Sequence, residues 1–366
     1  MIKKVCWVTG DYFLQVDLPI IKQISDFVEL HWVVVFGSYQ KYYSITHIKN
    51  FCCTNNISCE IIHNSSASSP KLFFQQIKML INLRRNKSDL YYFNYYGLPY
   101  FYFILKLFID KSKSLVAVHN VKVPNGNRGE KLEKFYQNFG LNLLSNILTF
   151  SESQFSLAKK KFPKKNVFSI PLPLSDYGEP KRNNLNSKIQ FLFFGNITKY
   201  KRLDILIKAV ERLSCEQKSK IGVTIAGKDF VWSEYKKLIK SKLVFNLKIK
   251  TIPDEEVADL FATHHYLVLP YQDIAQSGPL KIAYRYNVPV VASNLDAFLE
   301  DIVHKENGFV FEKNNTDSLT EILKFIISNH NSFYSQMQVN LKNYVKNNLS
   351  NNSIINQYLK IFKNEF

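Results

Sequence analysis

The chain has 366 residues, which is too long for one ordinary hydrophobic core and comfortable for two domains. Hydrophobic residues make up 46% of it, so the composition excludes a collagenous or largely disordered protein. The net charge of +18 predicts attraction to something anionic, such as nucleic acid, an acidic membrane surface or a phosphorylated substrate. The alternative is that the excess lysines are only solvated surface charges.

The five cysteines indicate a reducing compartment. Their number is odd and no Cys-x-x-Cys occurs, which argues against a disulfide framework and favours the cytoplasm. Cys52, Cys53, Cys59 and His63 fit no familiar zinc-ligand spacing, so we expect no zinc site there. No secretion signal is visible. The most apolar stretch, residues 98–109, contains Lys106 and is too short to span a bilayer, which predicts a buried or surface-packed helix.

The first half alternates short apolar runs with helical patterns. Strands are expected at residues 3–10, 31–37, 58–64, 89–97, 114–121, 146–153 and 167–174, and helices at 18–27, 71–85 and 128–144. A strand–helix rhythm of this kind is typical of a parallel sheet with helices on both faces. The polar segment 175–187 contains Gly, Pro and Asn and is interpreted as a linker between domains.

The same rhythm restarts after the linker. Strands are expected at residues 188–197, 222–229, 247–253, 265–271, 288–293 and 307–312, and helices at 202–213, 234–243, 254–264, 278–287 and 316–328, before an Asn-rich helical tail. The sequence therefore predicts an α/β protein of two doubly wound domains, residues 1–174 and 188–346, with residues 347–366 packing back on the first. Ligands of such sheets bind at the carboxyl ends of the strands, here in a cleft between the domains.

A first candidate for phosphate binding follows the strand at 188–197. Gly195 permits close approach of a ligand, and Lys199, Lys201 and Arg202 come just before a helix, where their charges can neutralise a diphosphate. The alternative is that these cations are solvated surface charges. A second candidate is the helix start at Ser277, where free backbone amides attract phosphate, although the same pattern also describes a well-capped core helix.

In the first half, His119 lies just past a predicted strand end. The competing interpretation is a histidine that is satisfied by backbone contacts. The adjacent His264 and His265 are interpreted as structural.

These segments together carry a family likeness. The order FFGNITKYKRLDILIKA, VTIAGK, IPDEEVADLFATHHYLVLPY and QSGPLKIAYRYNVPVVASN resembles the carboxyl-terminal domain of retaining glycosyltransferases of family 4, which have the GT-B fold, and VAVHNV, ILTFSESQ and IPLPLSDY resemble the amino-terminal domain. The resemblance assigns roles to residues at the matching positions. His119, Lys201 and Arg202 are expected to act in catalysis, and the expected donor-binding residues are Gly10, Gly195, Asn196, Gly227, Ile252, Tyr271, Asp273, Gln276, Ser277, Gly278 and Lys281.

Two departures from the family pattern concern the donor site. The usual arginine after the first glycine is Asn196, and the glutamate that normally grips the ribose aligns with Ile282. Arg202, where relatives often have glycine, and Lys281 are candidates to replace the lost contacts. A catalytically inactive relative that binds a glycan or a partner protein therefore stays open as an alternative.

The resemblance implies transfer of a hexose-type sugar from a nucleotide-diphosphate sugar to a glycan or lipid-linked oligosaccharide, with retention, in surface polysaccharide synthesis. No Asp-x-Asp occurs, so we expect no metal and no other cofactor. The expected location is the cytoplasm, with docking on the inner face of the membrane through basic residues of the first domain, namely Lys71, Lys78, Arg84, Arg85, Lys87, Lys106, Lys111 and Lys113. Nucleic acid is not an expected partner, because no recognisable binding motif accompanies the charge. An epimerase or phosphorylase of the same fold remains a further alternative.

Overall fold

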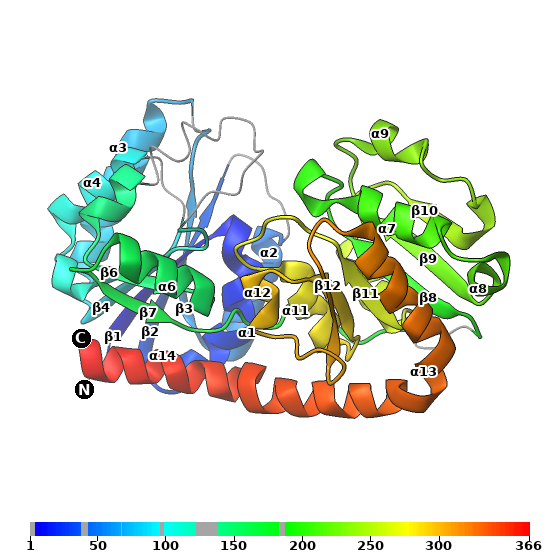
Figure 1. The fold of residues 1–366 in the computed structure, drawn as a ribbon. Coiled ribbons are helices and arrows are strands. Elements are labelled where there is room, and N and C mark those ends of the chain that lie inside the picture. Colours follow the sequence, from blue (N-terminus) through cyan, green and yellow to red (C-terminus); the bar gives the residue numbers. More distant parts are fainter. Residues whose placement is uncertain (1–3, 38–42, 67, 96–98, 122–137, 183–186) are drawn as a thin grey trace. The chain divides into compact units, whose positions relative to one another are not determined.

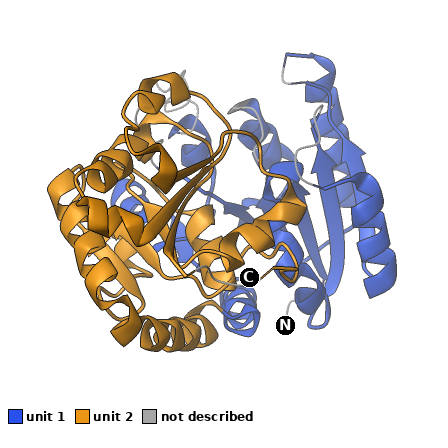
Figure 2. Cartoon of the chain, turned by 90° about the vertical axis from the view of Figure 1, so that its right-hand side faces the viewer, with its two compact units in different colours: residues 1–123, 128–173, 350–366 blue, residues 124–127, 174–349 orange. Residues whose placement is uncertain are grey.

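The computed structural model describes residues 4–37, 43–66, 68–95, 99–121, 138–182 and 187–366 (Figure 1). The described chain forms two compact units, shown in Figure 2. Unit 1 contains the described residues up to 121, then 138–173 and 350–366, and unit 2 contains those of 174–349. Most of the basic helix expected at 128–144 lies outside the described residues.

Unit 1 is built on a parallel sheet. Its described strands are β1 (Lys4–Gly10), β2 (Glu29–Phe36), β3 (Ser58–His63), β4 (Leu90–Asn94), β5 (Ser114–Ala117), β6 (Asn146–Thr149) and β7 (Asn166–Ser169). Their order in the sheet is β3-β2-β1-β4-β5-β6-β7, and every pair is parallel. The order reverses between β1 and β4, which is where a doubly wound sheet opens at its carboxyl edge to a ligand.

Helices cover both faces of this sheet, because successive side chains of a buried strand point to opposite sides. Val5 and Trp7 of β1 belong to a core that includes α1 (Leu14–Ser25) and α14 (Asn351–Glu365). Cys6 and Val8 belong to a second core. That core includes α3 (Lys71–Arg85), α4 (Pro99–Phe108) and α6 (Glu152–Lys161). Unit 1 also contains α2 (Ile45–Asn55), which the sequence reading missed.

Helix α14 is an integral part of the first core. Tyr358 is fully buried, its ring centroid lies 5.2 Å from that of Trp7, and its hydroxyl lies 3.2 Å from the hydroxyl of Tyr92. The side chain of Asn351 donates a hydrogen bond to the carbonyl of Pro19 in α1. Residues 350–366 therefore supply part of the hydrophobic interior of unit 1.

Unit 2 repeats the architecture. Its strands are β8 (Ile189–Phe194), β9 (Ile221–Ala226), β10 (Phe245–Lys248), β11 (Tyr266–Leu269), β12 (Val290–Ser293) and β13 (Gly308–Phe311), in the order β10-β9-β8-β11-β12-β13. Its helices are α7 (Leu203–Glu211), α8 (Cys215–Ser219), α9 (Trp232–Lys236), α10 (Asp254–Ala262), α11 (Gly278–Arg285), α12 (Asp296–Leu299) and α13 (Thr316–Tyr344). The strand order reverses between β8 and β11. The predicted α/β class with two doubly wound sheets is confirmed.

Several predicted boundaries were wrong. Helix α1 begins at Leu14, not at residue 18 as predicted. Pro19 therefore lies inside the helix and not in its first turn. The helix expected at 234–243 ends at Lys236, and β10 is shorter than expected and starts earlier, at Phe245. Helix α13 runs on to Tyr344, since no Gly or Pro interrupts the sequence from 316 to 344.

Among the helices of the described ranges, none combines the length and the apolar character needed to cross a membrane. Residues Pro99–Phe108 of the apolar stretch form α4, whose Phe101, Ile104 and Leu105 are buried in unit 1. The prediction of a packed helix there is confirmed.

Candidate functional site

Two glycines bring backbone close to backbone at the carboxyl edge of the second sheet. Gly195 directly follows β8 and Gly227 directly follows β9, with φ angles of +111° and +155°. A Cβ atom on Gly227 would lie 2.0 Å from the carbonyl oxygen of Gly195. A Cβ atom on Gly195 would lie 2.6 Å from the Lys201 Nζ. Only glycine fits either position, so the ends of β8 and β9 and the lysine ammonium form one tightly packed group.

Lys201 is a buried cation beside this glycine turn. Its side chain comes from the single turn Lys199–Lys201 after β8, and the residue is only 6% exposed. Burial lowers the pKa of Lys201 from 10.5 to about 8. Within the part of the chain that the structure describes, its ammonium makes no ion pair, and its contact is with the ring of Tyr271, whose centroid lies 5.2 Å away. A charge held in this way is costly unless a bound anion completes the site.

The loop that carries Lys201 is tied to the end of β11, the neighbour of β8 in the sheet. The amide of Gln272 donates a hydrogen bond of 2.9 Å to the carbonyl of Tyr200. The carbonyl of Tyr271 accepts one of 2.6 Å from the Ser293 hydroxyl. These bonds fix the Tyr271 ring beneath the ammonium, and the ring excludes water from that side of Lys201.

The amino-terminus of α11 approaches the same point. Ser277 is the N-cap, and its hydroxyl accepts a hydrogen bond from the amide of Leu280. Pro279 has no amide hydrogen, but its Cγ lies 3.9 Å from the position of a Cβ atom on Gly195, while Gly278 faces open space. The helix terminus and Lys201 therefore converge on Gly195. Positive charge and a helix amino-terminus together form a typical phosphate site.

Arg202 is paired with a carboxylate of α7. Its backbone is left-handed, at φ 47° and ψ 46°, a conformation that favours glycine over other residues. Its guanidinium makes two bonds to the Asp204 carboxylate, at 2.9 and 3.1 Å, and a third to Asn314 at 2.6 Å. These contacts hold the start of α7. A direct role of Arg202 in catalysis stays a prediction.

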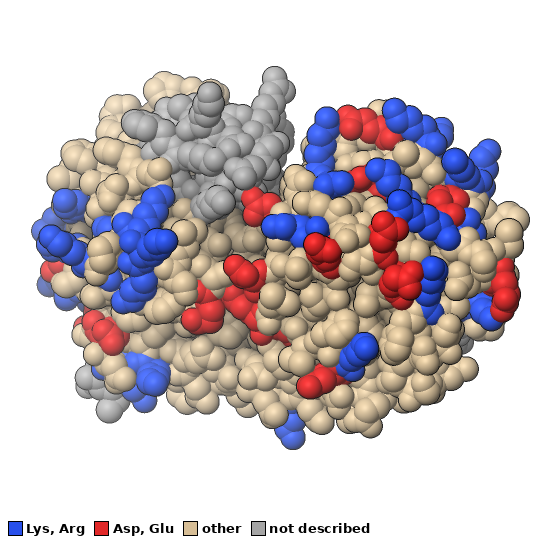
Figure 3. Space-filling model, viewed as in Figure 1, with Lys and Arg blue, Asp and Glu red and all other residues tan. Residues whose placement is uncertain are grey.

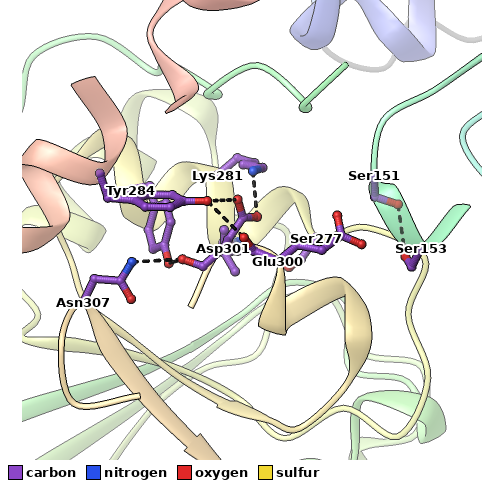
Figure 4. Close-up of polar contacts among 10 residues, drawn as sticks. Ser151, Ser153, Ser277, Lys281, Tyr284, Glu300, Asp301 and Asn307 are labelled. Atoms are coloured by element: carbon purple, nitrogen blue, oxygen red, sulfur yellow. Dashed lines mark hydrogen bonds and ion pairs between the residues drawn. The ribbon is translucent and has the colours of Figure 1, made fainter. Parts of the chain in front are cut away.

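Lys281 is held by a carboxylate at the other side of α11. Its ammonium lies 2.7 Å from Asp301, and both side chains are nearly buried (Figure 4). Asp301 also accepts a hydrogen bond of 3.0 Å from the Tyr344 hydroxyl, and its carbonyl accepts one from Tyr284. The arrangement anchors α11 to the segment after α12 and to α13. Ile282, which the resemblance aligns with a ribose-binding glutamate, lies in the hydrophobic core.

The other expected donor-binding residues lie in segments that leave the same sheet edge. Asn196 is exposed directly beside Gly195. Asp273 and Gln276 are half-buried between β11 and α11, and Ile252 is buried just before Pro253, the N-cap of α10. Contact of these four side chains with a ligand stays a prediction.

A second polar group lies at the carboxyl edge of the sheet in unit 1. His119 follows β5, stacks on Phe13 at a centroid distance of 4.1 Å, and places its Nε2 2.8 Å from the Oδ1 of Asn94. Burial lowers the pKa of His119 to about 3, so the imidazole is neutral. Gly10 ends β1, and a Cβ atom there would lie 3.3 Å from the Tyr95 ring. Both predicted residues of unit 1 thus lie at the edge where its strand order reverses.

The sequence reading missed Asn94 and Asp17, the partners of His119 in this group. Asn94 is the last residue of β4, and Asp17 is an acidic residue within the apolar face of α1. A lone carboxylate among Leu14, Ile20 and Ile21 was the signal that could have revealed a buried polar site. The pair His264 and His265 is structural as expected, because His264 bonds to Thr224 and His265 accepts the amide hydrogen of Gln190.

In the described residues, no three His, Cys, Asp or Glu side chains are grouped so that they could hold a metal ion. Cys52, Cys53, Cys59 and His63, which all lie in the described ranges, do not form such a group.

Comparison with known proteins finds a sequence family that resembles unit 2. Residues 179–348 match the family model described as Glycosyl transferases group 1. A curated relative, an uncharacterized glycosyltransferase of Haemophilus influenzae, is 29% identical over 195 residues, which cover 52% of this chain and 54% of the relative. The chain spans about half the length of the curated relatives it matches.

Solved structures resemble the chain over nearly its whole length. A glycosyltransferase from Rickettsia africae has a TM-score of 0.74 at 15% identity, covering 99% of this chain and 98% of that one. HepE of Anabaena in complex with UDP has a TM-score of 0.72 at 14% identity, with 98% and 99% covered, and HepE has also been solved with UDP-glucose. At these identities the likeness establishes the fold, and the predicted GT-B architecture of two Rossmann-like domains is confirmed.

Proposed function

We propose that the chain is a glycosyltransferase that moves a hexose-type sugar from a nucleotide-diphosphate donor, bound around Lys201, to a glycan or lipid-linked acceptor. The observation that carries the proposal is the buried ammonium of Lys201, which forms no ion pair with any described residue and lies over Gly195, beside the amino-terminus of α11. A diphosphate supplies the missing negative charge. The match of residues 179–348 to Glycosyl transferases group 1 supports this activity.

The proposed donor is a UDP-sugar. The support comes from HepE, a protein of the same fold whose structures contain UDP and UDP-glucose. In this chain the diphosphate binds to Lys201 and to the amide of Gly278, and the base lies near Ile252. Asn196 and Ile282 then require that the ribose be held by contacts other than the arginine and glutamate of the family pattern.

The proposed reaction breaks the bond between the sugar anomeric carbon and the diphosphate oxygen, and forms a bond from that carbon to an acceptor oxygen. Negative charge grows on the leaving diphosphate, where the Lys201 ammonium and the α11 terminus stabilise it. Retention of configuration follows if the acceptor attacks on the face that the diphosphate leaves. A phosphate oxygen then takes the acceptor's hydroxyl proton.

A nucleotide panel tests the donor site. We expect UDP to raise the melting temperature more than GDP, ADP, CMP or dTDP, with no added metal, because a ligand that binds only the folded state stabilises it. Lys201→Met should abolish the shift. Lys324→Met is the matched control, because Lys324 is an exposed partner of Glu321 on α13. No shift with any nucleotide would contradict the proposal and favour a binding protein without catalytic activity.

We also propose that unit 1 docks on an anionic membrane surface, where a lipid-linked acceptor for surface polysaccharide synthesis would lie. Its α3 and α4 pack together through Phe73 and Tyr100, and they expose Phe74, Phe103 and Leu107. The same two helices carry exposed cations, namely Lys71, Lys78, Arg84, Arg85 and Lys106. Figure 3 shows Lys and Arg side chains gathered over unit 1 around α4 and α6.

Apolar side chains flanked by cations are typical of proteins that bind acidic lipids peripherally. Flotation with vesicles tests this surface. The protein should rise with vesicles that contain an anionic lipid at low salt, and Phe74→Ser with Leu107→Ser should weaken the association. Failure to float with anionic vesicles would refute the docking proposal. It would not affect the proposal for the donor site.

A further inference from the structure

A polar pocket of about 690 Å³ lies at the amino-terminal edge of the sheet in unit 2. Its lining residues come from the starts of three neighbouring strands, β8, β9 and β11, or from just before them, and from the middle of α13. The two glycine turns and Lys201 lie at the other end of β8 and β9, so the pocket is not part of the candidate donor site. A volume of this size is typical of a site for a small molecule.

The pocket is lined by a buried hydrogen-bond donor whose direction is fixed by the backbone. His265 is 6% exposed and directly precedes β11. Its Nδ1 lies 3.0 Å from the backbone nitrogen of Gln190, which can only donate. Burial lowers the pKa of His265 to about 4, so the imidazole is neutral. Its ring hydrogen is therefore on Nε2, and no residue of the described ranges accepts a hydrogen bond from that atom.

A second imidazole in the pocket has the same arrangement. The Nδ1 of His330 lies 3.1 Å from the hydroxyl of Tyr266, a residue that is fully buried. Within the described residues this nitrogen is the hydroxyl's sole hydrogen-bond partner, so a hydroxyl that accepted from Nδ1 would leave its own hydrogen buried and unpaired, which is costly. The hydroxyl therefore donates. Burial also lowers the pKa of His330, so the ring is neutral and its hydrogen is on Nε2.

The charge around the pocket is positive. Lys188 and Lys220 line it, and no Asp or Glu is among the lining residues. Lys220 forms an ion pair with Glu216 at 2.6 Å, whereas the exposed Lys188 makes no ion pair with any other described residue. Two ammonium groups and two imidazole N–H donors near a single carboxylate favour an anionic ligand. A metal ion would need ring lone pairs, which neither Nε2 has in this tautomer.

The α13 side of the pocket supplies neutral polar groups. Its residues are Ser328, Asn329, Asn331 and Ser332. Asn329 and Ser332 bond to carbonyls of the helix itself. The exposed side chains of Ser328 and Asn331 make no hydrogen bond with another described residue. A hydroxyl and an amide can each donate and accept, which suits the hydroxyl groups of a sugar.

We propose that this pocket binds a sugar phosphate, with its phosphate held by the Nε2–H groups of His265 and His330 and by the Lys188 ammonium, and its sugar hydroxyls bound by Ser328 and Asn331. The proposal does not rest on the function proposed for Lys201, because the two sites share no residue. A ligand bound in this way joins α13 to the starts of β8 and β11, so it stabilises unit 2.

Titration calorimetry with glucose 6-phosphate tests the site. We expect saturable binding to the wild type, weaker binding of inorganic phosphate, and no binding of glucose at the same concentration. Lys188→Met should weaken the affinity for glucose 6-phosphate by roughly 10-fold or more, because a charge-assisted hydrogen bond is lost. Lys342→Met is the matched control, because Lys342 is an exposed residue of α13 outside the pocket, and it should bind as the wild type does.

The same titration of Lys201→Met separates the pocket from the donor site, since Lys201 also attracts phosphate. Binding that persists in Lys201→Met and is weakened in Lys188→Met supports the proposal. Binding that survives Lys188→Met unchanged, or no binding to the wild type, would overturn it. An affinity for inorganic phosphate equal to that for glucose 6-phosphate would overturn the assignment of a sugar. Long-range ¹H–¹⁵N spectra give a further readout, because an Nδ1–H form of His265 would remove the donor on which the site depends.

Discussion

Replacing Lys201 by methionine should make the protein more stable while it destroys nucleotide binding. The lysine is 6% exposed, and its pKa falls from 10.5 to about 8 because burial disfavours the charged form. A fall of this size corresponds to about 3 kcal/mol of destabilisation at neutral pH. Loss of the contact with the Tyr271 ring offsets about 1 kcal/mol. The variant should therefore gain about 2 kcal/mol, or roughly 4–8 °C in melting temperature.

The pH dependence of this gain provides a stricter test. Below pH 8 the lysine is charged in both the folded and unfolded wild type, so the full penalty is present. Between pH 8 and 10.5 the unfolded lysine still binds a proton that the folded one has lost, so the wild type gains stability as pH rises. The advantage of Lys201→Met should thus shrink from pH 7 to pH 10.

Urea unfolding of the two proteins at both pH values measures the difference. Other titrating groups affect wild type and variant alike, so they cancel in the comparison. A variant that is less stable than wild type at pH 7, or an advantage that stays constant up to pH 10, would refute the reasoning that Lys201 is a desolvated cation awaiting an anion.

Three further predictions concern the same unit. Gly195→Ala places a methyl group 2.6 Å from the Lys201 Nζ, so it should abolish the UDP-induced rise in melting temperature, whereas Gly178→Ala, also at positive φ but with no atom within 4 Å of the new Cβ, should keep it. A UDP shift that survives in Gly195→Ala would contradict the placement of the diphosphate. Lys281→Ala leaves the Asp301 carboxylate buried and unpaired, so urea unfolding should show a loss of about 3 kcal/mol, and a loss below 1 kcal/mol would show that the ion pair is not structurally important. Near pH 8.5, UDP binding should take up close to one proton, because the anion raises the pKa of Lys201, and calorimetry in two buffers of different ionisation enthalpy should detect it in wild type but not in Lys201→Met.

The sequence was sufficient to predict the strands of both sheets and the position of Lys201 beside the glycine turn. Buried parallel strands leave near-continuous apolar runs such as residues 189–194, and a glycine followed six residues later by lysine is a local pattern. The runs therefore predicted the strands, and the spacing placed the lysine beside the glycine turn.

Contacts between distant segments could not be predicted from local sequence patterns. Whether Arg202 faces a ligand or Asp204 depends on a left-handed backbone residue, and its bond to Asn314 joins positions 112 residues apart. The partner of Lys281 is likewise a carboxylate twenty residues away, which becomes a neighbour only when α11 and α12 fold over the sheet. Charge type could be read from the sequence, but not which charges neutralise each other within the protein.

The place of α14 in the core of unit 1 has a consequence for how the chain folds as it is synthesised. Tyr358 and Phe362 are buried beside Trp7, so the interior of the first unit stays incomplete until residues 350–366 have left the ribosome. Residues 174–349, which form the second unit, emerge before them. Part of the apolar interior of the amino-terminal unit then stays exposed while the later unit can already fold. This reverses the usual order of co-translational folding. Chaperone dependence and aggregation of nascent protein should therefore be most sensitive to changes in α14.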